Sequence, residues 1–213
     1  MIDSEAGARA FVASLCDDVA MDRLCRFIDL LIEENERQNL VAAKSLGEVW
    51  QRHIADSAQL LSHVSRETLE RPWLDLGTGA GFPGVVIAIL RPQWPVRLVE
   101  SRARRIEWLR SVVLDLKLAH CEVIGSRLEQ VETFSASVIS ARAFAPMPRL
   151  LDLSARFSTA ETLWLLPKGR SAAQDLASLP KAMRDMFHVE QSLTDAASGI
   201  VLGSLAGKTE RTR

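Results

Sequence analysis

Tyrosine is absent from this sequence of 213 residues, and cysteine occurs only three times. The three are Cys16, Cys25 and Cys121, an odd number of residues too far apart in the sequence for a metal knuckle or a redox pair. We therefore expect them to be thiols in the core. The longest apolar run, Val85 to Leu90, is too short to cross a membrane. The N-terminal sequence MIDSEAGARA also lacks the basic and apolar regions of a signal peptide, so we expect a soluble, cytoplasmic protein with no membrane partner.

Net charge is only −1, which argues against a general nucleic-acid coat protein. The charges are unevenly distributed: residues 1–70 hold 7 Lys and Arg against 13 Asp and Glu, whereas the rest of the chain holds 19 against 14. Two basic clusters stand out, the tail GKTERTR and the block SRARRIEWLR, with Arg102, Arg104, Arg105 and Arg110. Each cluster is either an anion-facing surface or a solvated helix face.

The hydrophobic pattern changes near residue 70. Apolar residues at 21, 24, 25, 28, 31 and 32 have the spacing of an amphipathic helix. Ser45 with Glu48 three residues later matches a capping box and predicts a second helix from Leu46 to about His63. From Trp73 onward, short strand-like runs alternate with helical ones, which predicts a parallel sheet with helices on both faces.

We therefore expect an α/β, Rossmann-like fold, with a helical cap over residues 1–70 and a catalytic domain over residues 71–213. The late runs FHVEQSL and GIVLGSL predict a closing pair of strands.

The stretch LDLGTGAGFPG, residues 74–84, contains two overlapping glycine patterns. Gly77, Gly79 and Gly81 alternate after the acidic Asp75, whereas Gly79, Gly81 and Gly84 form the dinucleotide fingerprint. The stretch follows the first predicted strand, where doubly wound sheets bind their ligands. Both patterns therefore predict a ligand loop, but for different ligands.

Asp75 favours the pattern that begins at Gly77. A carboxylate at the end of a strand repels a pyrophosphate but accepts an ammonium group. The second predicted strand ends in Glu100, which is placed to accept hydrogen bonds from ribose hydroxyls, and both patterns tolerate it. These anchors suit S-adenosylmethionine, which carries ribose, amino and carboxylate groups but no phosphate, and they require no metal. An NAD(P)-dependent oxidoreductase and a purely structural turn remain alternatives.

Absent motifs narrow the methyl acceptor. The chain has no Asn-Pro-Pro-aromatic motif for exocyclic amines, and no Pro-Cys dipeptide to supply the nucleophile for carbon-5 of pyrimidines. Guanine N7 needs neither, because its lone pair is exposed and there is no proton to remove. Positioning and electrostatics could supply most of the rate for such an acceptor. Guanine N7 is therefore compatible with these absences, and other acceptors are not excluded.

Several sequence blocks occur in the order seen in the bacterial 16S ribosomal RNA methyltransferase G family, also called glucose-inhibited division protein B. They are NL at 39–40, RHIADS at 52–57, LDLGTGAGFPG, VESRARRIEWLR, SRLEQ at 126–130, VISARAFAP at 138–146 and LPKG at 166–169. The resemblance covers about residues 20–203. It implies a class I S-adenosylmethionine-dependent methyltransferase fold, and methyl transfer to N7 of a guanine in the 530 loop of 16S rRNA.

By position, the resemblance implies cofactor contacts at Gly77, Phe82, Leu128, Glu129 and Arg142. Gly77 would bring backbone amides to the methionine part, and Phe82 would form an apolar wall. Leu128 with Glu129 would hold the adenine. Arg142 would pair with the cofactor carboxylate or steer an rRNA phosphate.

His53 and Asp56 lie three residues apart, and their spacing alone predicts a local helix pair. The resemblance implies instead that they project over the cofactor pocket as catalytic residues beside Arg142. Phe144 would lie where the target base enters, and an aromatic ring there could stack on a flipped guanine.

The implied partner is 16S rRNA within the 30S subunit, bound by a monomeric protein without a DNA partner. Because the basic charge is limited to one part of the chain, we expect a folded particle to be preferred over naked RNA. A non-catalytic ribosome assembly factor is the remaining alternative.

Overall fold

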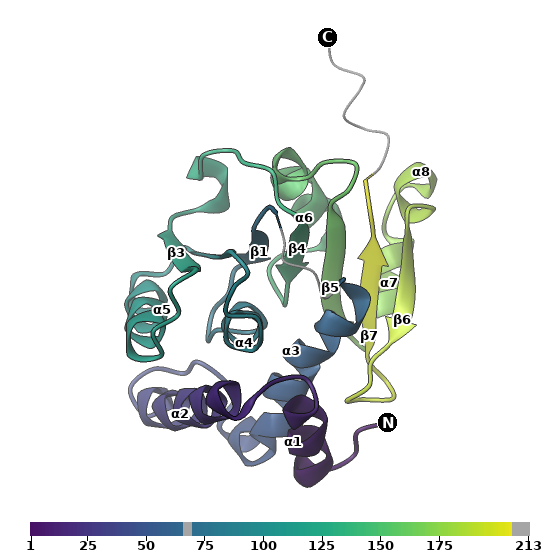
Figure 1. The fold of residues 1–213 in the computed structure, drawn as a ribbon. Coiled ribbons are helices and arrows are strands. Elements are labelled where there is room, and N and C mark those ends of the chain that lie inside the picture. The colour runs from purple at the N-terminus through teal and green to yellow at the C-terminus, as the bar shows by residue number, and fades with distance from the viewer. Residues whose placement is uncertain (66–69, 206–213) are drawn as a thin grey trace.

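The computed structural model of this protein describes residues 1–65 and 70–205. A seven-stranded sheet lies at the centre, in the order β3-β2-β1-β4-β5-β7-β6 (Figure 1). The strands are β1 (Trp73–Leu76), β2 (Val96–Glu100), β3 (Cys121–Gly125), β4 (Val138–Ala141), β5 (Leu163–Gly169), β6 (Phe187–Gln191) and β7 (Gly199–Gly203). The basic tail after residue 205 lies outside the described residues.

Strands β1 to β5 are parallel, and β7 runs antiparallel to both β5 and β6. The predicted parallel sheet and the predicted closing strand pair are both confirmed. Because the first five strands share one direction, their carboxyl ends meet at one edge of the sheet, where ligands bind in folds of this kind. Strand β6 also runs parallel to β5, so the loop between β6 and β7 lies at that same edge.

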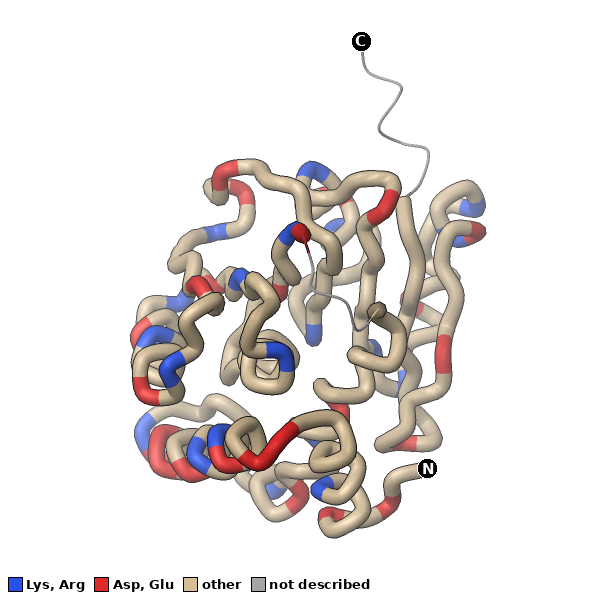
Figure 2. The backbone as a smooth tube through the Cα atoms, in the orientation of Figure 1, with Lys and Arg blue, Asp and Glu red and all other residues tan. Residues whose placement is uncertain are grey.

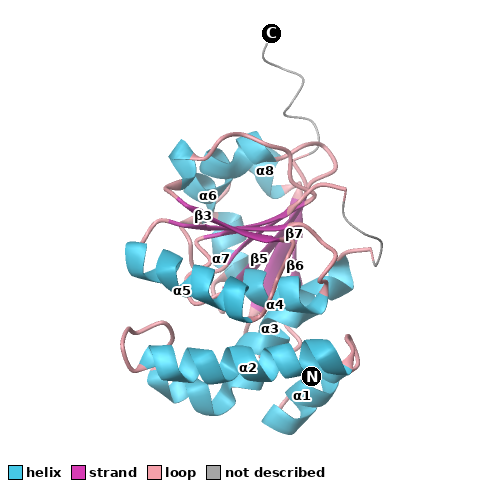
Figure 3. Ribbon diagram, turned by 60° about the vertical axis from the view of Figure 1, so that its left-hand side comes forward, coloured by secondary structure: helices cyan, strands magenta, loops and turns pink. Residues whose placement is uncertain are grey.

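Helices cover both faces of the sheet (Figure 3). One face carries α4 (Gly84–Leu90) and α5 (Ala103–Asp115), and the other carries α6 (Met147–Ser154), α7 (Ala172–Ala177) and α8 (Lys181–Arg184). Side chains alternate between the faces along β1: Trp73 packs with the α4 side, whereas Leu74 and Leu76 pack with the α6 side. The short helical segments η4 (Leu128–Gln130) and η5 (Ala155–Phe157) complete this part of the chain.

The first 65 residues form a helical layer beneath α4 and α5 (Figure 3). It contains α1 (Glu5–Ala13) and α2 (Asp18–Asn35), and the helix predicted from Met21 is the central part of α2. Many of the acidic residues lie on this layer (Figure 2).

The helix predicted over residues 46–63 is a chain of short irregular turns. It consists of η1 (Ala43–Glu48), a 3₁₀ segment; η2 (Trp50–Ala55), a π-helical segment; α3 (Asp56–Ala58); and η3 (Gln59–His63), again 3₁₀. The predicted capping box is wrong, because the Ser45 hydroxyl donates to the Ala42 carbonyl and contacts His53 instead of capping a helix. π-helical turns of this kind occur frequently at functional sites.

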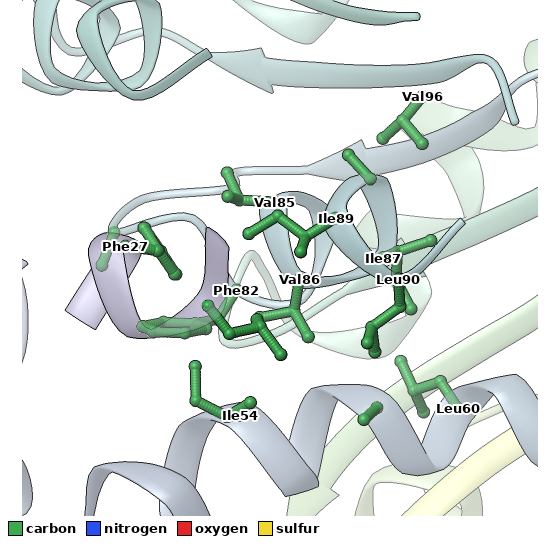
Figure 4. Close-up of a cluster of buried hydrophobic side chains, with 14 of the residues drawn as sticks. Phe27, Ile54, Leu60, Phe82, Val85, Val86, Ile87, Ile89, Leu90 and Val96 are labelled. Atoms are coloured by element: carbon green, nitrogen blue, oxygen red, sulfur yellow. The ribbon is translucent and has the colours of Figure 1, made fainter. Parts of the chain in front are cut away.

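Helix α4 is buried on every side, between the sheet and the helical layer. Figure 4 shows its side chains packed against Phe27 of α2 and against Ile54 and Leu60 of the irregular turns. Val85 and Ile89 of α4 are completely buried, and each such side chain contributes about 1.5–3 kcal/mol to folding. One apolar cluster therefore spans the helical layer and the sheet, so the predicted division at residue 70 would separate two layers that share a core.

In the described part of the chain, no helix is both long and apolar enough to cross a membrane. No group of metal-ligating side chains is found there either. Cys16, Cys25 and Cys121 are half-buried free thiols. They lie at the margin of the core, whereas the sequence predicted thiols within the core.

Candidate active site

The glycine loop follows β1 at the carboxyl edge of the sheet. Gly77, Gly79 and Gly81 have φ angles of 64°, 62° and 117°, a region that side chains other than glycine rarely adopt. A Cβ added at Gly77 would lie 2.6 Å from Cδ2 of Phe144, which follows β4. The loop therefore requires glycine both for its backbone path and for the close approach of Phe144.

Asp75 lies beneath this loop and is completely buried. Its Oδ1 accepts a hydrogen bond from the Ser140 hydroxyl at 2.7 Å, and its Oδ2 accepts one from the Gly84 amide at 3.1 Å. Burial raises the pKa of Asp75 to about 6, against the opposing effect of these hydrogen bonds. The carboxylate is thus engaged by neutral protein donors, where the sequence predicted an ammonium partner.

Glu100 ends β2 and lies beside the loop. Its Oε2 accepts a hydrogen bond from the Gly79 amide at 3.1 Å, while Oε1 accepts from the amides of Ser101 and Arg102. A carboxylate has about four lone-pair positions, so these three donors leave about one of them free. Glu100 therefore holds the loop in place and retains capacity for one further donor.

A pocket of about 180 Å³ lies between the loop and the end of β2; we call it the glycine pocket. Its lining includes Gly77, Glu100, Arg105, Leu128 and Phe144. Pockets for small ligands usually measure about 300–1,000 Å³. The glycine pocket is smaller, with Phe144 both lining it and lying close against the backbone of Gly77.

Arg142 follows β4 and lies at the centre of a polar cluster. Its Nη1 is 3.3 Å from Nδ1 of His53 and 3.8 Å from Oδ2 of Asp56, and its guanidinium carbon is 5.0 Å from the ring centre of Phe82. Burial lowers the pKa of Arg142, with Asp56 opposing that shift. The helical layer thus supplies an imidazole and a carboxyl group that contact an arginine at the end of a strand.

The hydrogen bonds of His53 define its tautomer. The Ser45 hydroxyl already donates to the Ala42 carbonyl, so it accepts from Nε2–H of His53 at 2.8 Å. Nδ1 is then the acceptor that faces Arg142. Burial, reinforced by Arg142 and Arg52, lowers the pKa of His53 from 6.5 to about 3. The imidazole is therefore neutral and acts as a hydrogen-bonding support for the arginine.

Asp56 is fixed from two directions. Its Oδ1 accepts hydrogen bonds from Gln59 Nε2 at 2.8 Å and from the Thr194 hydroxyl at 2.9 Å, and its Oδ2 faces Arg142. Burial raises its pKa, against the effects of Arg142 and of these donors. Thr194 lies in the loop between β6 and β7, so the C-terminal strand pair takes part in positioning this carboxylate.

Three residues implied by the resemblance, Phe82, Glu129 and Arg142, do not line the glycine pocket. Phe82 is buried behind the loop, where its ring stacks on His53 at 4.9 Å between centres. The Glu129 carboxylate lies 3.9 Å from Arg149 on the surface. Gly77, Glu100 and Leu128 do line the pocket.

Four residues that support the site were not predicted from the sequence: Ser45, Arg105, Ser140 and Thr194. Ser140 had a readable signal, because a serine inside the apolar strand VISA requires a buried partner. Arg105 belonged to the basic block. Ser45 was recognised but assigned to a cap, and nothing local distinguishes Thr194.

Solved structures share this fold. A precorrin-6y C5,15-methyltransferase from Geobacter metallireducens GS-15 aligns with 78% of this chain and 90% of its own, with a TM-score of 0.53 and 12% identity. A putative methyltransferase from Pseudomonas syringae aligns with 70% and 96%, with a TM-score of 0.54 and 21% identity. A mutant of MtNAS in complex with S-adenosylmethionine aligns with 94% of this chain and 77% of its own, with a TM-score of 0.53 and 16% identity. The fold is that of the class I S-adenosylmethionine-dependent methyltransferases.

Sequence relatives define the family. The family model described as rRNA small subunit methyltransferase G matches residues 20–199. The ribosomal RNA small subunit methyltransferase G of Erythrobacter litoralis is 59% identical over 98% of this chain and 100% of the relative. The corresponding protein of Novosphingobium aromaticivorans is 56% identical over 96% of this chain and 90% of the relative. The chain belongs to the rRNA small subunit methyltransferase G family, as its motifs predicted, and is an S-adenosylmethionine-dependent methyltransferase.

The glycine pocket offers groups that fit S-adenosylmethionine. Glu100 retains an acceptor position for a hydroxyl, and Arg105 is a cation of the kind that a carboxylate requires. Leu128 and Phe144 supply apolar surface. The family and the fold thus decide between the two glycine patterns in favour of the one that begins at Gly77.

Proposed function

We propose that this protein transfers a methyl group from S-adenosylmethionine to N7 of a guanine in the 530 loop of 16S rRNA. The substrate would be the 30S subunit in the cytoplasm, and the protein would act as a monomer without a DNA partner. The observation that carries the proposal is the Arg142 cluster, in which a half-buried arginine is held by His53 and Asp56 near the glycine loop, in a member of an rRNA methyltransferase family.

S-adenosylmethionine supplies an electrophilic methyl group on a sulfonium, which the N7 lone pair takes while the carbon–sulfur bond breaks. The guanine then carries the positive charge that the sulfur loses, and no proton has to be removed. A methyl transfer of this kind depends on the orientation of the two reactants and on fixed electrostatics more than on acid or base catalysis. The neutral His53 agrees with that requirement, since it holds Arg142 without taking part in proton transfer at neutral pH.

The proposed roles follow from position. The Gly77, Gly79 and Gly81 backbone, shaped by Asp75 from below and by Glu100 from the side, would hold the cofactor. Leu128 and Glu129 would contact the adenine, and Phe82 would support the pocket from behind. Arg142, held by His53 and Asp56, would pair with the cofactor carboxylate or an rRNA phosphate.

The test is methyl transfer from labelled S-adenosylmethionine to 30S subunits from a strain that lacks this enzyme, followed by borohydride and aniline cleavage. N7 methylation makes the imidazole ring cationic and the strand cleavable at that nucleotide, so the cut reports the position. The proposal expects a single new cut in the 530 loop. Label without a cut contradicts N7, and no label in any particle contradicts this substrate and favours an assembly factor.

A second comparison tests the form of the substrate. Basic charge is concentrated after residue 70, so affinity for naked RNA should be weak and should fall steeply with salt. We therefore expect the 30S particle to be methylated faster than naked 16S rRNA at the same concentration. Equal rates for both would contradict this expectation while leaving the methyl transfer itself intact.

A further inference from the structure

A second pocket lies beyond Arg142 at the same edge of the sheet. It measures about 370 Å³, within the range of about 300–1,000 Å³ that small-ligand sites occupy. We call it the Asp195 pocket. Its lining includes Glu48, Arg52, Asp56, Arg170, Thr194 and Asp195.

Three separate parts of the chain build this pocket. Arg52 belongs to the irregular turns of the helical layer, Arg170 follows β5, and Asp195 lies in the loop between β6 and β7. All three parts meet at the carboxyl edge, which Figure 1 shows near α3, β5 and β7. The pocket therefore lies over the half of the sheet that the glycine pocket leaves free.

Asp56 and Arg142 connect the two pockets. Asp56 lines the Asp195 pocket, and its Oδ2 is 3.8 Å from Nη1 of Arg142. Arg142 is followed directly by Ala143, which lines the glycine pocket. A group bound in the Asp195 pocket therefore lies beside the pair at which the two pockets adjoin.

Asp195 is a preorganised acceptor. Its Oδ1 accepts a hydrogen bond from the Ala197 amide at 2.9 Å, and its Oδ2 accepts one from the Ser198 hydroxyl at 2.7 Å. These bonds lower its pKa, so the group is a carboxylate at neutral pH. Each oxygen retains a lone pair, and a fixed carboxylate that accepts two parallel N–H groups matches one edge of guanine.

We propose that the Asp195 pocket receives the extruded purine of the target guanosine, with Asp195 accepting from N1–H and the N2 amino group. This inference rests on the proposed function, since it names the site that would hold the methyl acceptor. Guanine N7 lies on the opposite side of the purine from N1 and N2. In the proposed pose the donors of the base face Asp195 and N7 faces Asp56 and Arg142, beside the glycine pocket.

The remaining residues suit a nucleotide. Arg170 is exposed, and Arg52 forms an exposed ion pair with Glu48 at 3.3 Å, which costs little to rearrange. Guanidinium groups bind phosphates and stack on bases. Adenine presents an acceptor at N1 where guanine presents a donor, so Asp195 would reject it.

The experiment compares 30S particles that carry guanosine or inosine at the methylated nucleotide, because inosine lacks only the N2 amino group. One hydrogen bond to a charged group corresponds to at least about a tenfold difference in rate. The wild type should therefore show kcat/KM about tenfold lower for inosine particles. In D195N, kcat/KM for guanosine particles should fall about tenfold and the preference over inosine should disappear.

Asn at 195 keeps an acceptor for Ala197 and a polar partner for Ser198, so the loop should retain its conformation. The matched control is D185N, an exposed carboxylate after α8 that lies outside the pocket. D185N should behave as wild type, and affinity for S-adenosylmethionine should be unchanged in both variants. Wild-type kcat/KM and an unchanged guanosine preference in D195N would overturn the inference.

R170A, with R184A as its exposed control, tests the phosphate contact. R170A should raise KM for the particle several-fold and reduce the salt slope by about one, with kcat unchanged. If R170A has this effect but D195N has none, the pocket binds a phosphate and the base assignment is wrong.

A binding measurement separates this inference from the proposed function. Guanosine 5′-monophosphate and inosine 5′-monophosphate can be titrated into the protein without any methyl transfer. The inference expects tighter binding of the guanosine nucleotide by wild type, and about tenfold weaker binding by D195N. Loss of that preference in D195N would support the pocket even if 30S particles took no label, and equal binding by both proteins would contradict it.

Discussion

The glycine pocket and the Arg142 cluster are neighbours built on different principles. Around the glycine loop, the decisive hydrogen bonds run from backbone amides to Asp75 and Glu100, between residues 9 and 21 positions apart. In the Arg142 cluster, the contacts join side chains that are much farther apart in the sequence: 89 positions from His53 to Arg142 and 138 from Asp56 to Thr194. The glycine loop itself is formed by one stretch of sequence, whereas the Arg142 cluster forms only after distant segments of the chain have come together.

This difference predicts opposite sensitivities. A site shaped by the backbone should be damaged by added atoms, because the loop has no space for them. A site assembled from distant side chains should be damaged by removed atoms, because each group holds another. The following substitutions test that contrast.

The largest effect should come from R142A. Removing the guanidinium deletes the group that His53 and Asp56 both hold, and loss of a preorganised charge near the reacting atoms lowers kcat/KM by about 100-fold or more. Single-turnover methyl transfer to 30S particles measures the effect, and R142K is the control that keeps the charge without the planar fork. Near wild-type turnover in R142A would remove the cluster from the mechanism.

A smaller effect, on stability, should come from G84A. An added Cβ would lie 2.7 Å from Oδ2 of Asp75 and would also meet the Leu98 side chain. Overpacking of this kind costs about 1–3 kcal/mol, measured as the free energy of unfolding in urea. G47A is the matched control, because a Cβ there meets nothing within 4 Å. Equal stability of the two variants would contradict the tight packing of the glycine loop.

The pH dependence of stability should reveal His53. Its pKa is about 3 when folded and 6.5 ordinarily, so the unfolded chain binds more protons between these values. Stability is therefore full above pH 6.5 and falls by about 1.4 kcal/mol per pH unit below it. Urea unfolding of wild type and H53Q between pH 7 and pH 5 checks this, since glutamine keeps both hydrogen bonds but does not titrate.

The informative quantity is the difference in unfolding free energy between wild type and H53Q. Asp75 changes the stability of both proteins with pH, in the direction opposite to His53, and its contribution cancels in that difference. The raised pKa of Asp75 makes its folded state bind protons more readily, so its contribution to stability falls as pH rises from about 4 to about 6. A difference between wild type and H53Q that stays constant with pH would show that His53 titrates normally.

The smallest effect should come from T194V. Valine has the shape of threonine but cannot donate to Asp56, so one of the two hydrogen bonds that hold Oδ1 is lost. The expected cost is about 1 kcal/mol in unfolding free energy, together with a several-fold lower kcat/KM. T194S keeps the hydroxyl and should restore both values. If T194V and T194S were alike, the strand pair would have no part in positioning Asp56.

The same contrast explains what the sequence could predict. The alternation of strands and helices, the closing strand pair and the glycine loop were all readable, because each depends on residues close together in the chain. The regular helix over residues 46–63 was not, since Ser45 serves His53 and the backbone between them winds into a π turn. The partner of Asp75 within the protein was not predicted for a related reason, because Ser140 lies 65 residues away in the chain.

Helix α4 has a consequence for how the chain is made. It is buried on every side, and the apolar stripe formed by Phe27, Ile54 and Leu60 has α4 as its partner (Figure 4). During synthesis, the first 65 residues leave the ribosome before any of the sheet exists, so this stripe has nothing to pack against. A nascent chain stopped before residue 84 should remain open to proteases and chaperones, and protection should begin once α4 and β2 have emerged.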